Sequence, residues 1–341
     1  MKILVYSGVT IAVIAIAISI MFSSGQSEFD KNQIRVVYLA NINHVVPIVG
    51  LENGEFAKEL GSTPIKTRIV DSGPEVVEAL FTKSADLGYM GPAPFVIGYV
   101  KSKGDDLKIL ASATSGGASF VVQKDSTVLS AADLSGKKIA APFIGNTQDV
   151  SLRHYLAENN LKSLEKGGTV TVYNIANPEI YTLFAKGDID AAWVPEPTAT
   201  MLVDQLGGKR LFKEEETWPD KKFSSVLLVG RTEFLEKHPD LVEKWITAHT
   251  NTVNWIKENP DKTESTFIDF YKKHTGKKLS PNIVHDSFSN VQITLEPLPN
   301  SIRTFAERAY ELGYLGHSGY NIDHIYYDKS SNTTETGQWQ N

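Results

Sequence analysis

One arrangement occurs twice along the chain: a helix with proline in its first turn, a short apolar strand, and a second helix behind a Pro-x-Pro turn. The first copy runs from Pro74-Glu75 to Pro92-Ala93-Pro94, and the second from Pro178-Glu179 to Pro195-Glu196-Pro197, with nearly the same separation. Proline suits the first helical residues because N–H groups there have no partner inside the helix. The repeat predicts two similarly built lobes, each with a strand that ends where a helix begins.

The rest of the central chain alternates in the same way. Apolar, β-rich runs predict strands at 34–39, 65–70, 85–90, 107–113 and 120–123, and helical spacing or capping signals fill most of the intervals. Such alternation favours βαβ units and mostly parallel sheets. The 341 residues suit two domains of ordinary size.

The two ends of the chain differ from this pattern. Residues 3–22 carry no charge and, at about 1.5 Å per residue, could cross a bilayer core of about 30 Å. Lys2 precedes them and acidic residues follow, which predicts that the remainder lies outside the cytoplasmic membrane. We expect residues 1–25 to form either an uncleaved anchor or a removed signal, 26–33 a tether, and 328–341 a disordered polar tail with a glycosylation sequon at Asn332.

Composition excludes several classes of protein. The net charge of −6 offers no basic footprint for nucleic acid. With no cysteine, the chain can form no disulfide, thiolate metal site, cysteine nucleophile or lipidated cysteine. Phosphate-binding loops, dinucleotide fingerprints and hydrolase or zinc-protease motifs do not occur in the sequence. We therefore expect no metal and no cofactor.

The entrance to the helix after Ile144 carries the main chemical signal. Gly145-Asn146-Thr147-Gln148 lets the backbone approach a ligand, and the first N–H groups of a helix can hold an oxyanion without a cationic side chain. Ordinary N-capping by Asn146, with Asp149 three residues on, explains the same residues. Polar or glycine-rich segments at 41–44, 91–94 and 115–119 also follow strands, and ligands of open α/β sheets bind at the carboxyl ends of strands.

Four runs together resemble the nitrate/sulfonate/taurine-type solute-binding proteins of ABC importers, within the thiamine-precursor-binding superfamily. They are GNTQDVSLRHYLAENNL (145–161), GDIDAAWVPEPTA (187–199), ADLSGKKIAAP (132–142) and RTEFLEKHPDLVEKW (231–245). The resemblance covers about 34–326 and implies a two-lobed, periplasmic-binding-protein-like α/β fold of type II, with crossover strands between lobes at 34–118 plus 226–327 and 119–225. It also implies a monomeric, non-enzymatic receptor on the outer face of the cytoplasmic membrane. Such a receptor delivers a small anionic solute to a permease and its ATPase subunit.

Carried over residue by residue, the resemblance implies a ligand pocket built from five segments. Its residues are Asn41, Asn43 and His44; Gly91, Pro92 and Ala93; Gly116, Gly117 and Ala118; Asn146, Thr147 and Gln148; and Trp193 and Glu196.

Three of these side chains have other interpretations. His44 suits an exposed loop, Trp193 suits the core of a lobe, and Glu196 suits a helix cap because a buried carboxylate repels an anion. The preferred ligand is a small oxyanion: an aliphatic sulfonate, taurine or nitrate. A pyrimidine or other heteroaromatic stacked on Trp193 with Glu196 as acceptor, an enzyme on the same fold, and a sensor lobe remain alternatives. The acidic run 214–216 is predicted to be a solvated loop.

Overall fold

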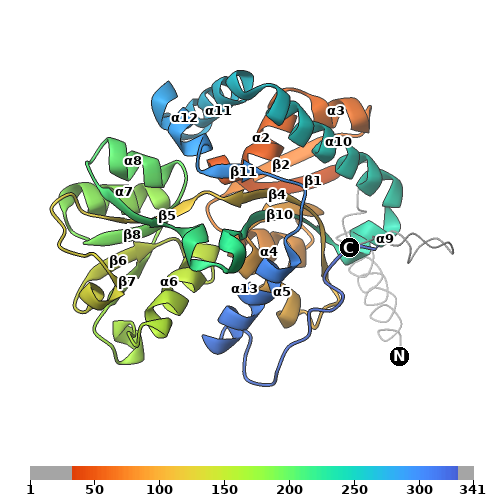
Figure 1. The fold of residues 1–341 in the computed structure, drawn as a ribbon. Helices are drawn as coiled ribbons and strands as arrows, with labels where there is room; N and C mark the ends of the chain where they lie inside the picture. Colours follow the sequence, from red (N-terminus) through yellow and green to blue (C-terminus); the bar gives the residue numbers. More distant parts are fainter. Residues whose placement is uncertain (1–32, 329–341) are drawn as a thin grey trace, which may run out of the picture. The chain divides into compact units, whose positions relative to one another are not determined.

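The computed structural model describes residues 33–328, and Figure 1 shows their arrangement. The predicted anchor or signal, most of the tether, the residues after 328 and the Asn332 sequon lie outside the described residues. Within 33–328, no helix combines the length and the apolar character that crossing a membrane requires.

Two separate sheets divide the strands. The first has the order β11-β4-β10-β3-β1-β2 and the second β7-β6-β8-β5-β9. The first sheet comprises β1 (Ile34–Leu39), β2 (Ile65–Val70), β3 (Leu87–Met90), β4 (Leu107–Gly116), β10 (Ser224–Arg231) and β11 (Val291–Ile293). The second comprises β5 (Ala118–Val122), β6 (Lys138–Ala141), β7 (Thr171–Asn174), β8 (Ala191–Pro195) and β9 (Lys209–Lys213).

Both sheets are mixed. The strands β1, β2 and β3 pair in parallel, and so do β6, β7 and β8. The remaining pairings are antiparallel: β10 with β3 and β4, β11 with β4, and β5 with β8 and β9. The chain passes from the first sheet to the second after β4 and returns with β10. The two-lobed α/β prediction is confirmed, while the parallel pairing is confined to three strands in each sheet.

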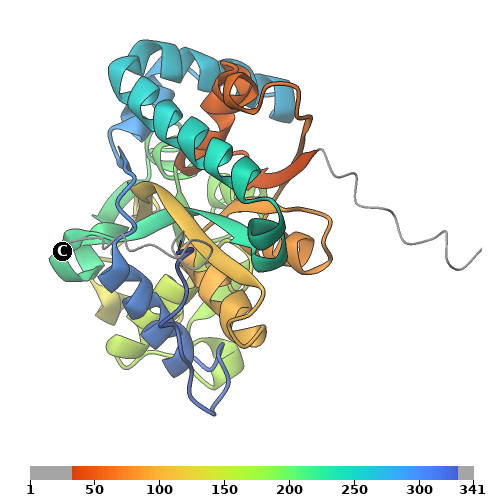
Figure 2. The same cartoon turned by 90° about the vertical axis from the view of Figure 1, so that its right-hand side faces the viewer.

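Helices pack on both sheets. On the first sheet they are α2 (Val45–Glu52), α3 (Glu55–Leu60), α4 (Gly73–Phe81), α5 (Pro92–Lys101), α9 (Thr232–Lys237), α10 (Pro239–Glu258), α11 (Pro260–Thr275), α12 (Pro281–Phe288) and α13 (Pro299–Glu311). On the second they are α6 (Thr147–Glu158), α7 (Asn177–Lys186) and α8 (Thr198–Asp204). Each sheet with its helices is called the first or second lobe below, and Figure 2 shows α10 lying along α2 and α3 of the first lobe.

The repeated arrangement seen in the sequence is present in both lobes. It is α4–β3–α5 in the first lobe and α7–β8–α8 in the second, with proline at or just before the start of each second helix. Ser72 caps α4, since its hydroxyl accepts from the Glu75 N–H. The apolar faces of these helices fill separate cores, one set around β1, β3 and β10 and another around β5, β6 and β8.

The chain first crosses between the lobes at Gly116-Gly117, the junction of β4 and β5. Both glycines have positive φ, +72° and +75°. An added Cβ on Gly117 would lie 2.6 Å from Val291 Cγ2 and 2.8 Å from Asn43 Nδ2. Glycine is required there because the backbone is left-handed and the neighbouring side chains leave no room.

Candidate functional site

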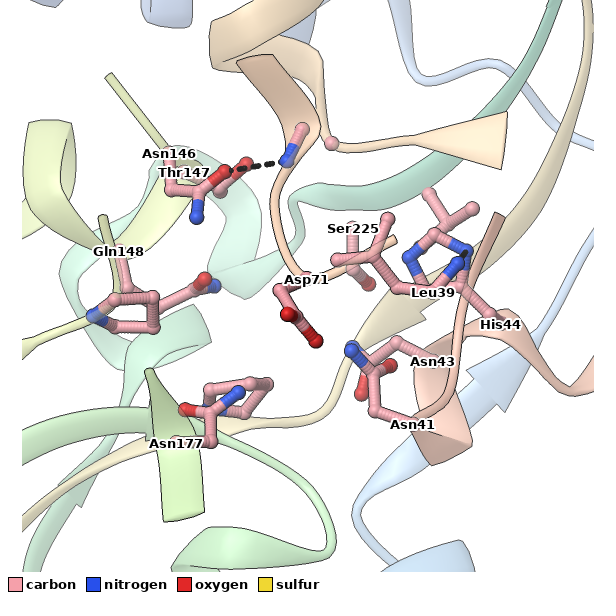
Figure 3. Close-up of a pocket in the computed structure, with 15 residues that line it drawn as sticks. Leu39, Asn41, Asn43, His44, Asp71, Asn146, Thr147, Gln148, Asn177 and Ser225 are labelled. Carbon is pink, nitrogen blue, oxygen red and sulfur yellow. Dashed lines mark hydrogen bonds between the residues drawn. The ribbon is translucent and has the colours of Figure 1, made fainter. Parts of the chain in front are cut away.

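The carboxyl ends of six parallel strands face one cavity between the lobes (Figure 3). Residues that follow β1, β2 and β3 line one side, and residues at the ends of β6, β7 and β8 line the other. The lining residues are Leu39, Asn41, Asn43, His44, Asp71, Gly73, Gly91, Pro142, Asn146, Thr147, Gln148, Asn177, Pro195, Ser225 and Val226. This is the place where open α/β sheets bind ligands. The volume is about 40 Å³, which suits a solute of few heavy atoms because one water needs roughly 10–15 Å³ on this scale.

Half of the predicted site residues meet in this cavity: Asn41, Asn43, His44, Gly91, Asn146, Thr147 and Gln148. They come from both lobes and from strand ends far apart in the sequence. The start of α5 meets the start of α6, since an added Cβ on Gly91 would lie 2.1 Å from Thr147 Oγ1. The two turns that the sequence analysis singled out therefore share one cavity.

Asn146 forms a contact that capping did not predict. Its side chain makes no cap bond to α6. Instead, Asn146 Oδ1 accepts from the Gly73 N–H at 2.9 Å, which joins the start of α6 in the second lobe to the start of α4 in the first. The first N–H groups of α6, at Thr147 and Gln148, have no partner within the helix and lie beside the cavity.

His44 is buried rather than exposed, at 3%. Burial lowers its pKa from 6.5 to about 3, so the ring is uncharged at neutral pH. The Leu39 N–H donates to His44 Nδ1 at 3.4 Å. Because Nδ1 accepts, the proton of the neutral ring lies on Nε2, and His44 is a neutral hydrogen-bond donor in the wall of the cavity.

The other predicted residues support the cavity or lie in a core. Pro92 follows Gly91 at the start of α5, and Ala93 and Ala118 pack in one apolar cluster with Val150, Phe223 and Phe305. The Gly116 carbonyl accepts from Asn43 Nδ2 at 3.0 Å and from Ser225 Oγ at 2.7 Å. Gly116 and Gly117 therefore lie behind the wall of the cavity.

Trp193 and Glu196 lie outside the cavity, and both are fully buried. Trp193 packs edge-on against Phe120 and Phe212 in the core of the second lobe. Glu196 Oε2 accepts from the Thr200 N–H at 2.9 Å, in the cap-like role considered for it, and Oε1 accepts from Arg210 Nη1 at 3.1 Å.

The prediction that residues 214–216 form a solvated loop is wrong for Glu214. This residue is fully buried and accepts from Trp193 Nε1 at 2.8 Å, from Ser151 Oγ at 2.5 Å and from Gln148 Nε2 at 3.4 Å. Burial raises the pKa of its carboxyl group, and these donors oppose the shift. Glu214 thereby holds Gln148, a residue that lines the cavity. A buried indole N–H needs an acceptor, which is the signal that could have indicated it.

Sequence reasoning also missed Asp71, Asn177 and Ser225. Asp71 directly follows β2 and Asn177 begins α7 shortly after β7, so both occupy strand-end positions like that of Asn41. Figure 3 shows the Asp71 carboxylate pointing into the space between Asn41, Asn177 and Gln148. Neither lysine nor arginine is among the described residues that line the cavity.

A second, larger hollow of about 370 Å³ lies between α6, the 161–166 segment and residues 312–314. Its wall is mainly apolar, with Leu156, Leu161 and Leu312, and none of the predicted site residues lines it. The smaller polar cavity, lined by residues that follow strands of both lobes, is therefore the candidate ligand site.

Comparisons with known proteins agree with this geometry. The profile of the NMT1-like family matches residues 27–267. The taurine-binding periplasmic protein of Escherichia coli is 31% identical over 62% of this chain and 63% of its own length, slightly under two thirds. A putative aliphatic sulfonates-binding protein of Bacillus subtilis is 25% identical over 76% of each chain.

Solved structures share the fold. The alkanesulfonate-binding protein SsuA of Xanthomonas axonopodis, bound to MOPS, has a TM-score of 0.69 at 18% identity, and the match covers 83% of this chain and 92% of that one. The nitrate-binding protein NrtA of Synechocystis has a TM-score of 0.66 at 16% identity, with 84% and 83% covered.

Proposed function

Because the chain belongs to the NMT1-like family, we propose that it is the extracytoplasmic solute-binding component of an ABC importer and binds a small sulfonate. The observation that carries this is the polar cavity between the lobes, where strand ends from both sheets converge on the start of α6. Relatives named for taurine, aliphatic sulfonates and nitrate support the class of ligand. A binding role without catalysis fits these relatives.

The oxyanion end of the solute is held by neutral donors. The first N–H groups of α6, the Thr147 hydroxyl and His44 Nε2–H are the candidates, and the dipole of α6 favours negative charge at its start. Hydrogen bonds to a charged group contribute about 1.5–3 kcal/mol each. Three such bonds together approach the roughly 8 kcal/mol of a micromolar Kd.

Closure of the lobes around the solute gives the signal for transport. Several hydrogen bonds outside the ligand's own contacts join the lobes, among them Gly73 N–H to Asn146, Tyr314 to Asp149, and Asn290 to Glu196. Opening must break these bonds, and we propose that the arrangement described here is the closed form. We propose that the permease and its ATPase subunit recognise this form of a monomeric receptor. We also propose that residues 3–22 either anchor the receptor at the outer face of the cytoplasmic membrane or are cleaved, in which case the receptor is secreted.

A heteroaromatic ligand loses its support. That alternative depended on stacking against Trp193 and on Glu196 as an acceptor, and both side chains lie in the interior of the second lobe. A cavity of about 40 Å³ also suits a solute smaller than a pyrimidine with substituents.

Titration calorimetry with the purified chain tests the function. The panel contains taurine, ethanesulfonate, methanesulfonate, nitrate and hydroxymethylpyrimidine, with chloride as the control anion. We expect at least one sulfonate to bind with a Kd in the micromolar range or tighter. Heat from the pyrimidine alone, or from none of these solutes, would refute the proposed function.

A further inference from the structure

Both sides of the cavity present hydrogen-bond acceptors without partners among the described residues. The carboxamide oxygens Asn41 Oδ1, Asn43 Oδ1 and Asn177 Oδ1 are buried and accept no hydrogen bond within residues 33–328. All three residues line the cavity. Leaving one buried acceptor unpaired is costly, so three at one place indicate that a ligand supplies the donors.

The hydrogen bond of Asn43 determines which atom of its carboxamide group is the oxygen. Asn43 Nδ2 donates to the Gly116 carbonyl at 3.0 Å, so the other amide atom must be the oxygen. The residue is 4% exposed and lines the cavity, and its carboxamide oxygen has no hydrogen-bond partner within residues 33–328. Ser225 is constrained in the same way, because its hydroxyl hydrogen is given to Gly116 O and only its lone pairs remain for a ligand.

Asp71 adds a negative charge to these acceptors. Asp71 is exposed, its side chain forms no hydrogen bond or ion pair with the rest of the described chain, and it points between Asn41 and Asn177. Since His44 is neutral and the described lining holds no lysine or arginine, the formal charge of the lining is that of one carboxylate. A plain anion would meet this charge without compensation, whereas a solute with a cationic end would neutralise it.

We propose that the cavity contains an ammonium subsite, formed by Asp71, Asn43 and Asn177, which selects zwitterionic aminoalkanesulfonates over simple sulfonates. The ammonium group has three N–H donors, and Asp71 with the two carboxamide oxygens supplies three acceptors. The sulfonate end then lies toward the start of α6, and the volume of about 40 Å³ leaves room only for a short linker. This proposal rests on the function proposed above and names the class of solute.

Isethionate is the sharpest probe, because it carries a neutral hydroxyl where taurine carries an ammonium group. We expect calorimetry on the full chain to show taurine binding at least tenfold more tightly than isethionate or ethanesulfonate. In Asp71→Asn, taurine affinity should fall by roughly 10- to 100-fold while ethanesulfonate affinity stays equal or rises. Asp125→Asn, an exposed aspartate away from the cavity, serves as the matched control and should bind like the unaltered chain.

The outcomes separate the two proposals. Equal affinity for taurine and isethionate, or a taurine affinity that Asp71→Asn leaves unchanged, would overturn the ammonium subsite and leave a sulfonate receptor in place. Binding of no sulfonate at all would overturn the proposed function itself. A thermal shift with Ca²⁺ or Na⁺ alone that depends on Asp71 would overturn the subsite as well, because the acceptors would then hold a metal ion. Asn177→Ala is the second variant and should weaken taurine more than ethanesulfonate.

Discussion

Tyr314 tests whether closure contributes to affinity. It lies in the first lobe beyond α13, and its hydroxyl donates to Asp149 Oδ2 of the second lobe at 2.5 Å. Asp149 is fully buried and also accepts from Gly145 N, Arg153 Nε and Asn174 Nδ2, all within its own lobe. Burial and the charge of Asp149 raise the pKa of Tyr314, so it stays a neutral donor.

Tyr314→Phe removes this hydroxyl and keeps the ring. A hydrogen bond to a carboxylate contributes about 1.5–3 kcal/mol, and this one exists only while the lobes touch. The three remaining donors keep Asp149 paired, so the stability of the second lobe should change little. Tyr314 does not line the ligand cavity. The whole loss therefore falls on the closed form and weakens the apparent Kd by roughly 10- to 150-fold.

Calorimetry with the best solute of the panel measures this effect, and small-angle scattering with and without solute measures closure. Tyr310→Phe, four residues earlier and within α13, is the control because its hydroxyl forms no hydrogen bond across the lobes within residues 33–328. A Tyr314→Phe Kd within twofold of the unaltered chain would show that this contact does not report on closure. The reasoning from interlobe hydrogen bonds to affinity would then be refuted.

Two further changes test packing and burial. Gly117→Ala should lower the free energy of unfolding by more than about 2 kcal/mol, because it adds left-handed backbone strain and overlap with Val291. Gly136→Ala is the control, because Gly136 has the same φ of +75° but open space around it. Equal losses of stability for the two variants in urea denaturation would contradict the steric part of the argument. Burial lowers the pKa of His249 to about 4, so the folded state binds fewer protons than the unfolded state and loses stability as pH falls from about 6.5 to 4. The stability advantage of the unaltered chain over His249→Gln should therefore shrink by about 1.4 kcal/mol per pH unit in that window, and an advantage independent of pH would contradict the burial argument.

Local signals were enough to predict the two-lobed fold. Proline in the first turns of α4 and α7 and the Ser72 cap fix where helices begin, and these features depend only on nearby residues. The antiparallel strands were harder, because the pairing of β4 with β10 joins segments far apart in the chain. Nothing in a strand's own sequence states which strand will lie beside it.

The candidate site was predictable where it follows the strand-end rule. Asn41, Gly91 and Asn146 were found by that rule, and Asp71 satisfies it equally but was obscured by the adjoining cap at Ser72. Ser225 carried no signal, since its place in the wall depends on the pairing of β10. All residues of β8 are buried, so alternation could not assign Trp193 to one face.

The carbonyl oxygen of Gly116 has two structural roles. It belongs to the residue at which the chain leaves the first lobe, and it anchors Asn43 and Ser225, which both touch the solute space. Any twist of the peptide planes at that junction must displace both side chains together. In the proposed receptor, the residue at which the chain passes between the lobes therefore also positions two residues of the solute cavity, and variants at Gly116 should alter solute selectivity and lobe closure together.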